Sequence, residues 1–344
     1  MRRTLIALGV GLGLAGSTAV AAPAQAAPPV AAVTLSTTAQ AVETARFWLA
    51  DGGANLAAAT PYTVRTAASA QRTSTTPEPD GTPGQVVPLS PATEGEAPTT
   101  SGKVFFVAAD GLPHWCTGSA VHNQYRNLVA TAGHCVFDLA GETTAHSRIA
   151  FVPGYSGGVA PKGLYAGKQA TAHQDLTLFR DHDRDFAFVN VFSGVVADPA
   201  GVLSDLGRLA DNVGAQGFGW NQPPAPAFDV FGYPAGSHPD GSSPYTGQSL
   251  ERSTGAATGV AVSDPVAERL VGVGSPFTGA GSLGSAWMSG YDEGLGLGYL
   301  TGVTMSVSDT DGDERYDTGL SPYFDREAAL IFKAASVVWT GRLT

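Results

Sequence analysis

Short runs of apolar, β-branched or aromatic residues recur from Lys103 onward, and this pattern restricts the fold more than any other feature of the chain. Gly, Pro, Asp or Asn separates most of the runs, which is typical of an all-β sandwich or barrel. The 44 glycines and 23 prolines also favour turns and short strands over long helices. The clearest runs are 104–108, 128–131, 186–192, 228–232 and 297–307.

Three stretches favour helix instead. The spacing of Ala328, Leu330, Ile331 and Ala334 predicts a helix near the C-terminus. The three stretches are 325–338, a single turn at 202–209, and a weaker helical segment centred on 42–49.

Residues 1–26 have the pattern of an export signal. Arg2 and Arg3 precede an apolar stretch, and Ala24 and Ala26 supply the small residues that a signal peptidase reads. A membrane anchor would need about twenty apolar residues, and polar residues interrupt the run too early. We therefore expect a secreted, extracellular protein with no stable membrane insertion after signal removal.

Residues 27–101 differ in amino-acid composition from the rest of the chain. The stretch 73–101 is rich in Thr, Pro, Ser, Gly and Glu and contains hardly any large apolar residue. Such a composition buries too little surface to fold. We interpret 27–101 as a pro-segment or disordered tether that precedes the main domain.

The charge of the chain restricts its partners. The formal net charge is -11, and no basic run follows Arg2 and Arg3, so nucleic acid is excluded as a partner. We expect no cofactor and no metal, because two lone cysteines cannot form a structural zinc site. In an exported protein this pair, Cys116 and Cys135, predicts a disulfide instead. The oligomeric state stays open.

The segment 128–135 reads Leu-Val-Ala-Thr-Ala-Gly-His-Cys, so a histidine follows directly after an expected apolar strand. This segment resembles the histidine region of the trypsin and chymotrypsin family, in which a disulfide ties the loop that holds the general base. The resemblance implies that His134 is that base and that Cys135 pairs with Cys116.

The segment 185–189 reads Asp-Phe-Ala-Phe-Val, so an aspartate stands directly before an expected apolar strand. It resembles the Asp-x-Ala-x-Val/Leu segment of the same family, where the aspartate fixes the histidine tautomer. Asp185 matches that position. The segments 214–223, 231–235 and 322–324 are similar to a bacterial secreted branch of these peptidases.

This resemblance covers about residues 102–340. It implies a double six-stranded β-barrel with a C-terminal helix in a domain spanning 102–344. The two barrels would cover about 102–200 and 201–344.

The nucleophile is ambiguous. Relatives carry a pattern like Thr-Gly-Gly-Ser-Ser-Gly-Gly-Pro-Trp, with the second serine as nucleophile, and the matching loop is one residue longer here. Counting forward from Thr278 puts Ser282 in that position, whereas counting back from Trp287 puts Leu283 there. The cysteines that brace this loop in relatives are also missing.

Two functions follow from this ambiguity. In the first, the chain is a serine endopeptidase of a protein or peptide substrate, with a His134, Asp185 and Ser282 triad and backbone amides near Ala280 and Ser282 as oxyanion hole. In the second, Leu283 replaces the nucleophile, and the chain is a pseudopeptidase that binds peptides or peptidases.

Two other segments are less informative. The acidic pocket residue of trypsin falls on Pro276 or Phe277, so a preference for Lys or Arg is unsupported. The acidic stretch 309–314 lacks the glycine and glutamate positions of an EF-hand loop. We interpret it as an acidic turn, with weak, irregular calcium binding as the alternative.

Overall fold

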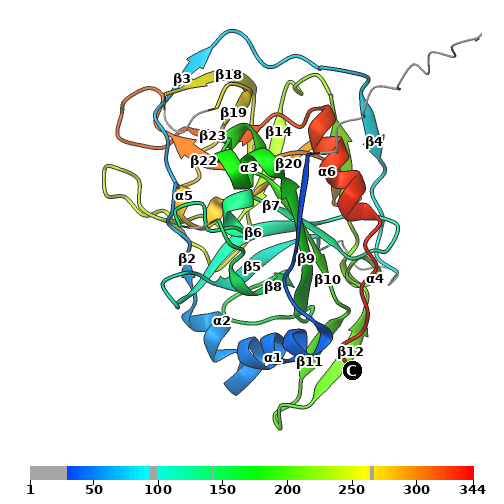
Figure 1. Cartoon of the computed structure of the whole chain (residues 1–344). Coiled ribbons are helices and arrows are strands. Elements are labelled where there is room, and N and C mark those ends of the chain that lie inside the picture. Colours follow the sequence, from blue (N-terminus) through cyan, green and yellow to red (C-terminus); the bar gives the residue numbers. More distant parts are fainter. Residues whose placement is uncertain (1–28, 93–98, 142, 264–266) are drawn as a thin grey trace, which may run out of the picture.

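The computed structural model describes residues 29–92, 99–141, 143–263 and 267–344. The expected signal segment 1–26 lies outside these residues. The central element is a closed barrel in which neighbouring strands are hydrogen-bonded in the order β9-β10-β7-β6-β5-β8, and β8 pairs with β9 to close it (Figure 1). Its strands are β5 (Ser101–Val107), β6 (Pro113–Val121), β7 (Leu128–Thr131), β8 (Ser147–Pro153), β9 (Tyr165–His173) and β10 (Ala187–Val191).

The C-terminal half forms a half-barrel, and together with the closed barrel it matches the predicted double-barrel architecture. One sheet has the order β17-β14-β20-β21-β13, and a second has the order β22-β23-β19-β18. The chain passes directly from β17 to β18, which joins the two sheets. Their strands are β13 (Gly217–Trp220), β14 (Phe228–Gly232), β17 (Glu251–Gly255), β18 (Ala257–Val262), β19 (Leu270–Gly274), β20 (Ala286–Asp292), β21 (Leu297–Val303), β22 (Ser306–Ser308) and β23 (Thr318–Pro322).

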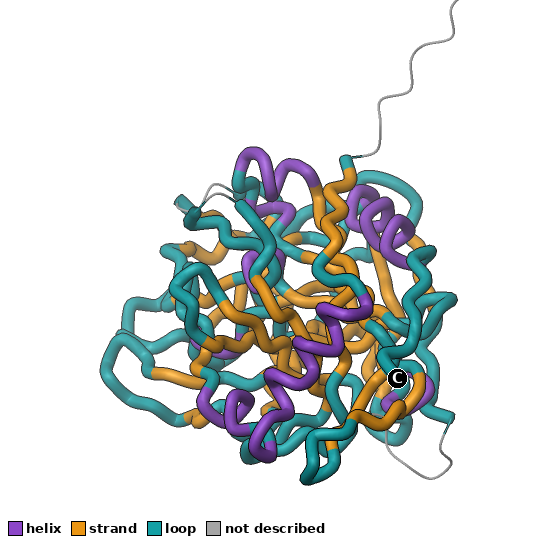
Figure 2. Tube along the Cα trace, turned by 60° about the horizontal axis from the view of Figure 1, so that its bottom comes forward, coloured by secondary structure: helices purple, strands orange, loops and turns teal. Residues whose placement is uncertain are grey.

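Helices are few and lie mainly at the periphery (Figure 2). The expected C-terminal helix is α6 (Arg326–Ser336), whose first turn is capped by the Asp325 carboxylate. The remaining short elements of the main domain are the helical turns η2 (Gly133–Cys135), α3 (Gln174–Phe179), η3 (His182–Arg184), α4 (Leu209–Val213) and α5 (Gly279–Ser282), and the strands β11 (Gly194–Ala197), β12 (Leu203–Gly207), β15 (Ala235–Gly236) and β16 (Tyr245–Thr246).

The prediction of a helical turn at 202–209 was wrong. Most of this stretch forms β12, which pairs antiparallel with β11, and the helix α4 begins only at Leu209. Side chains along β12 alternate between half-buried and exposed, as expected for a strand with one covered face.

The segment before the barrels is built into both halves of the fold. It contains β1 (Val30–Thr34), α1 (Thr38–Leu49), η1 (Ala50–Gly52), α2 (Ala54–Ala58), β2 (Thr60–Pro61), β3 (Ala70–Thr73) and β4 (Gly84–Val86). The weak helix expected at 42–49 is therefore present as α1, and its Trp48 is fully buried. In Figure 1 the chain climbs from α2 past β2 to β3 and then crosses to β4.

The expectation of disorder in 73–101 does not hold for its described residues. β3 adds to the edge of β18, and β4 adds to the edge of β13. Edge strands present unpaired N–H and C=O groups, so this polar segment gains a backbone ladder without a core of its own. Residues 93–98 lie outside the described part.

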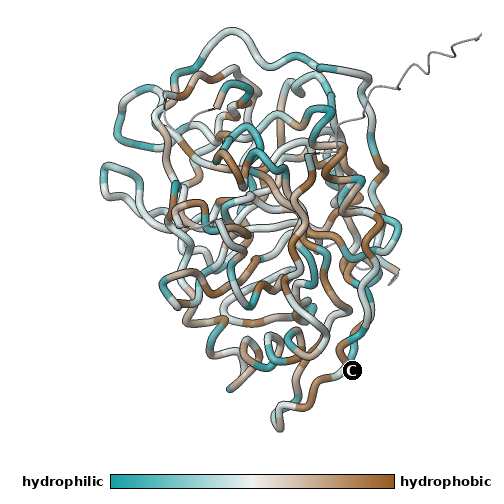
Figure 3. The backbone as a smooth tube through the Cα atoms, in the orientation of Figure 1, coloured by the Kyte–Doolittle hydropathy of each residue, from teal (hydrophilic) through white to brown (hydrophobic). Residues whose placement is uncertain are grey.

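Figure 3 colours the loops that project at the left of the molecule mainly teal or white, so these loops are largely polar. One core cluster fills the closed barrel and includes Val104, Val129 and Val189, and another joins the half-barrel to α6 through Phe218 and Phe332. Within the described residues, no helix is both long and apolar enough to cross a membrane.

Candidate functional site

His134 and Asp185 form a buried hydrogen-bonded pair. His134 lies in η2 directly after β7, and Asp185 lies between η3 and β10, which pairs with β7. His134 Nδ1 donates to Asp185 Oδ2 at 2.7 Å, and the His134 backbone N–H donates to Oδ1 at 2.9 Å. The strand pairing therefore brings together the two residues that the sequence singles out.

Asp185 is ionised in this environment. Burial alone would raise its pKa, but the charge of His134 and hydrogen bonds from His134 and His182 outweigh burial and hold the pKa well below its ordinary value. Because an ionised carboxylate only accepts hydrogen bonds, His134 Nδ1 is the donor in this bond, and Nε2 is the ring nitrogen that Asp185 leaves unbound. His134 is thus oriented as a base.

The turn that carries Asp185 is anchored to the C-terminal half. The Asp183 carboxylate accepts the backbone N–H groups of Glu268 and Arg269 at 2.7–3.0 Å. Arg184 donates to Asp325 at 2.8 Å, which ties the same turn to the start of α6. These contacts hold Asp185 where the two halves of the molecule meet.

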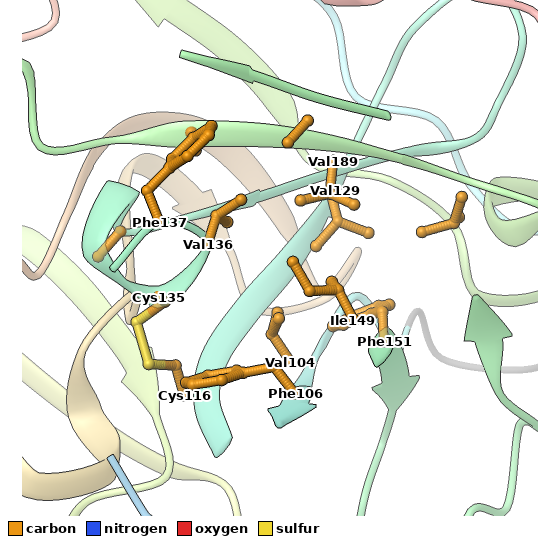
Figure 4. Close-up of a cluster of buried hydrophobic side chains, with 14 of the residues drawn as sticks. Val104, Phe106, Cys116, Val129, Cys135, Val136, Phe137, Ile149, Phe151 and Val189 are labelled. Atoms are coloured by element: carbon orange, nitrogen blue, oxygen red, sulfur yellow. A yellow bond between two sulfur atoms is a disulfide. The ribbon is translucent and has the colours of Figure 1, made fainter. Parts of the chain in front are cut away.

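The expected disulfide is present. Cys116 of β6 is bonded to Cys135 of η2, and their Cα atoms are 6.1 Å apart, within the usual range for disulfides. Figure 4 shows the bond at the edge of the barrel core, near Val104 and Phe106. It ties the turn that contains His134 to β6.

The Ser282 hydroxyl is not directed to His134. Ser282 is fully buried at the end of α5, and its Oγ donates to the backbone oxygens of Thr278 at 2.6 Å and Gly279 at 3.1 Å. His134 Nε2 is also buried, and it has no hydrogen-bond partner among the residues that the structure describes. The bond between Ser282 and His134 that a triad requires is therefore not formed.

The backbone of the loop is irregular directly before Ser282. The backbone of α5 leaves helical geometry at Ala280 and Gly281 and then turns sharply. Ser285 N–H closes this turn onto the Ser282 oxygen at 2.9 Å. Of the expected oxyanion positions, Ala280 is part of this kink and Ser282 follows it, and the role of both stays a prediction.

Leu283 takes the buried position after the kink. Its side chain belongs to the core cluster that includes Ala132 and Cys135, on either side of His134 in the chain. Its carbonyl accepts the Thr117 N–H at 2.8 Å, which fixes the loop to β6. The next residue must be glycine, because Gly284 has φ +81° and a Cβ there would lie 2.1 Å from the Thr117 oxygen.

Tyr62 covers this site, and sequence reasoning missed it. The residue comes from the N-terminal segment, is 5% exposed, and stacks against His134 with ring centroids 6.4 Å apart. Its ring also meets His146 edge-on at 5.4 Å. Burial, with the nearby Asp138 and Asp110, raises the pKa of Tyr62 to about 12, so it is a neutral phenol. The sequence offers no local signal for so distant a contact.

A second unexpected feature is the buried ammonium of Lys103. It lies 3.4 Å from the centre of the Trp115 ring and 4.0 Å from that of Tyr155. Tyr233, from the other half of the molecule, lies 5.5 Å away. Burial lowers the pKa of Lys103 to about 7. This aromatic cage therefore joins the two halves close to β6.

Two further segments singled out in the sequence are the pocket position near Phe277 and the acidic stretch 309–314. Phe277, one of the two positions that the sequence matches to the acidic pocket residue of trypsin, is buried and packs edge-on against Tyr245. The carboxylates of Asp309, Asp311 and Asp313 lie close together, but each already accepts backbone N–H groups of its own loop.

Comparison with known proteins identifies the architecture. No family model matches the chain, and no curated protein matches it. Among solved structures, the thermostable serine protease AL20 from an extremophilic microorganism is 24% identical with a TM-score of 0.57, over 70% of this chain and 98% of that one. The protease Anisep from Arthrobacter nicotinovorans is 26% identical with a TM-score of 0.57, over 73% of this chain and 100% of that one.

The chain has the chymotrypsin fold. Part of the molecule lies outside each alignment, although both proteases are covered almost completely. A chymotrypsin fold supports a protease-like ancestry, but the activity of this chain depends on the groups around His134.

Proposed function

We propose that this chain is a non-hydrolytic member of the chymotrypsin-fold proteins, which binds peptide segments over the His134 site. The observation that carries this proposal is the engagement of the Ser282 hydroxyl with the Thr278 and Gly279 oxygens. A serine becomes a nucleophile only when a base accepts its proton. Here the Ser282 hydroxyl donates its proton to two backbone carbonyls of its own loop instead of to a base.

The position of Leu283 supports the same proposal. A leucine has no group that could form a covalent intermediate, and this one is fully buried in the core cluster of the barrel. Ser285, the next serine along the loop, is buried beside Gly232, where a Cβ on that glycine would lie 1.9 Å from Ser285 Oγ. No serine hydroxyl among the described residues therefore bonds to His134 Nε2.

The intact pair is compatible with a protein that has lost hydrolysis. Asp185 accepts the His134 backbone N–H as well as the ring N–H, so it stabilises the turn after β7 in addition to orienting the imidazole. Loss of either residue would leave a buried polar group without a partner. Structural need can therefore preserve the pair after catalysis is lost.

We also propose that the protein is exported. The pattern of residues 1–26 and the paired cysteines support this, because disulfides persist in oxidising compartments outside the cytosol. A peptide or protein partner then fits an extracellular setting.

A fluorophosphonate probe tests the absence of hydrolysis without knowledge of the substrate, because it labels any activated serine. We expect folded wild-type protein to show no labelling above that of a Ser282→Ala variant, with trypsin in the same mixture as positive control. Labelling of the wild type that disappears in Ser282→Ala would contradict the proposal.

A further inference from the structure

The N-terminal segment passes over the His134 site as an extended strap, which we define as residues 59–68. Its side chains alternate, with Tyr62, Val64, Thr66 and Ala68 partly or fully covered and the residues between them exposed. This two-residue period is that of a peptide lying along a surface. In Figure 1 the strap is the stretch that runs past β2 and α5 toward β3.

The first end of the strap is held by β6. Residues Thr60 and Pro61 pair in parallel with β6, and the Tyr62 N–H donates to the Trp115 oxygen at 2.9 Å. Trp115 Nε1 donates in turn to the Ala59 oxygen at 3.2 Å. A side-chain hydrogen bond joins Thr60 Oγ1 and His114 Nδ1 at 3.0 Å.

The Tyr62 ring provides the main apolar contact of this end. Besides His134 and His146, it meets the rings of Phe106 at 5.1 Å and His114 at 5.6 Å. Aromatic residues held in such ring-lined sites dominate the energetics of many interfaces. The site beneath the strap is therefore built to hold an aromatic side chain.

The second end is held by the half-barrel. The Thr66 oxygen accepts the Val307 N–H at 3.0 Å, and the Ala68 N–H donates to the Val307 oxygen at 2.9 Å. The backbone of the strap also touches the loop before Ser282, since a Cβ on Gly279 would lie 2.4 Å from the Thr66 oxygen. Main-chain hydrogen bonds of this kind are used wherever an extended peptide adds to an exposed edge.

The middle of the strap is held by side-chain packing, since Val64 packs against the core cluster of the closed barrel, and not by hydrogen bonds. Residues 63–65 make no hydrogen bond to any other residue that the structure describes. Arg65 has a positive φ of 55°, a conformation that costs a non-glycine residue free energy. Two separate anchors joined by a strained link can detach without unfolding either half of the molecule.

From these contacts we infer that the surface beneath the strap is a binding site for an extended peptide, and that the strap is its intramolecular occupant. The ligand would carry an aromatic residue at the position of Tyr62 and a small residue four positions later, at the position of Thr66. The inference rests on the proposed peptide-binding function and names the chemistry of the ligand. The strap then limits access, because a tethered segment acts at an effective concentration of about millimolar.

Release of the strap should open the site. A double variant, Tyr62→Ala with Ala68→Pro, removes the aromatic anchor and the N–H that reaches the Val307 oxygen. We expect a fluorescent peptide of residues 58–69 to bind this variant about 100-fold more tightly than wild type, by fluorescence anisotropy. The same peptide with its tyrosine replaced by alanine should bind the variant at least about 10-fold more weakly.

Two controls distinguish release of the strap from a general effect of mutation and from misfolding. A Thr63→Ala, Ser69→Ala variant changes only outward-facing residues and should behave as wild type. If the double variant does not fold, as judged by circular dichroism and the intact disulfide, the single variant Ala68→Pro should still bind the peptide more tightly than wild type.

Three results would overturn the inference. They are absence of binding to folded double variant, equal affinity for variant and wild type, and a wild-type dimer that exchanges its straps. These outcomes are independent of serine labelling, so failure of the inference and failure of the non-hydrolytic function can be told apart.

Discussion

Replacement of Asp185 by alanine should lower the free energy of unfolding by about 3–5 kcal/mol, the usual cost of breaking a buried charged pair. The carboxylate accepts the ring and backbone N–H groups of His134 and lies 3.4 Å from His182 Nδ1, and all these groups are buried. Urea unfolding at pH 7 measures the loss. Glu43→Ala, which removes an exposed carboxylate of α1, should change stability by less than about 0.5 kcal/mol.

The same carboxylate predicts how stability depends on pH. Because the folded-state pKa of Asp185 is lowered, its contribution is present above the unfolded pKa of about 4 and is lost as pH falls toward the folded value. Wild-type protein should therefore lose stability more steeply than Asp185→Ala below about pH 4. Parallel stability curves in that range would contradict the assigned role of Asp185.

Replacement of Lys103 by methionine should stabilise the protein near neutral and acidic pH. Burial lowers the Lys103 pKa from 10.5 to about 7, so the unfolded chain binds more protons between these values and wild-type stability rises with pH across that window. The shift opposes folding by up to about 5 kcal/mol at pH 6. In the wild type, the cation–π contacts of the ammonium offset part of this cost by about 0.5–2 kcal/mol each, and the methionine variant loses these contacts.

We therefore expect Lys103→Met to exceed wild type by about 2 kcal/mol at pH 6, with a difference that shrinks as pH approaches 9.5. Tyr155 and Tyr233 face the ammonium and have raised pKa values, so they do not titrate in this range. Urea unfolding from pH 6 to 9.5 checks the result. Lys333→Met, at an exposed lysine of α6, should show no such pH dependence. A Lys103→Met variant less stable than wild type at pH 6 would show that the cage stabilises the charged lysine.

Local patterns were sufficient for much of the barrel. The runs 128–131 and 228–232 coincide with β7 and β14, because an apolar or aromatic run bounded by turn residues has few alternatives to a buried strand. The run 297–307 was predicted as one element, but the chain forms two strands, β21 and β22, with Thr304 and Met305 between them.

Non-local contacts could not be predicted in this way. Residues 73–101 have too few apolar side chains to fold by themselves, and the partners of β3 and β4 lie far along the chain, at β18 and β13. Lys103 and Tyr62 are surrounded by rings from distant segments, so no sequence window contains their environment. His134 and Asp185 could be singled out from the sequence because each lies next to an apolar run that forms a strand.

The nucleophile loop was the one place where two alignments competed. Counting from Thr278 and from Trp287 differed by one residue, and no local pattern chooses between the two counts or predicts the irregular backbone at Ala280 and Gly281. In the structure the Ser282 hydroxyl turns back into its own loop, and Leu283 lies in the barrel core.

Fluorophosphonate labelling of the strap-released variant, Tyr62→Ala with Ala68→Pro, tests the central claim most directly. In this variant the strap no longer covers His134, so the orientation of Ser282 alone limits the reaction. If Ser282 is held by Thr278 and Gly279, the folded variant should remain unlabelled at pH 7 to 8. Labelling that maps to Ser282 by peptide mass spectrometry, and that His134→Ala abolishes, would show an active triad and contradict the account.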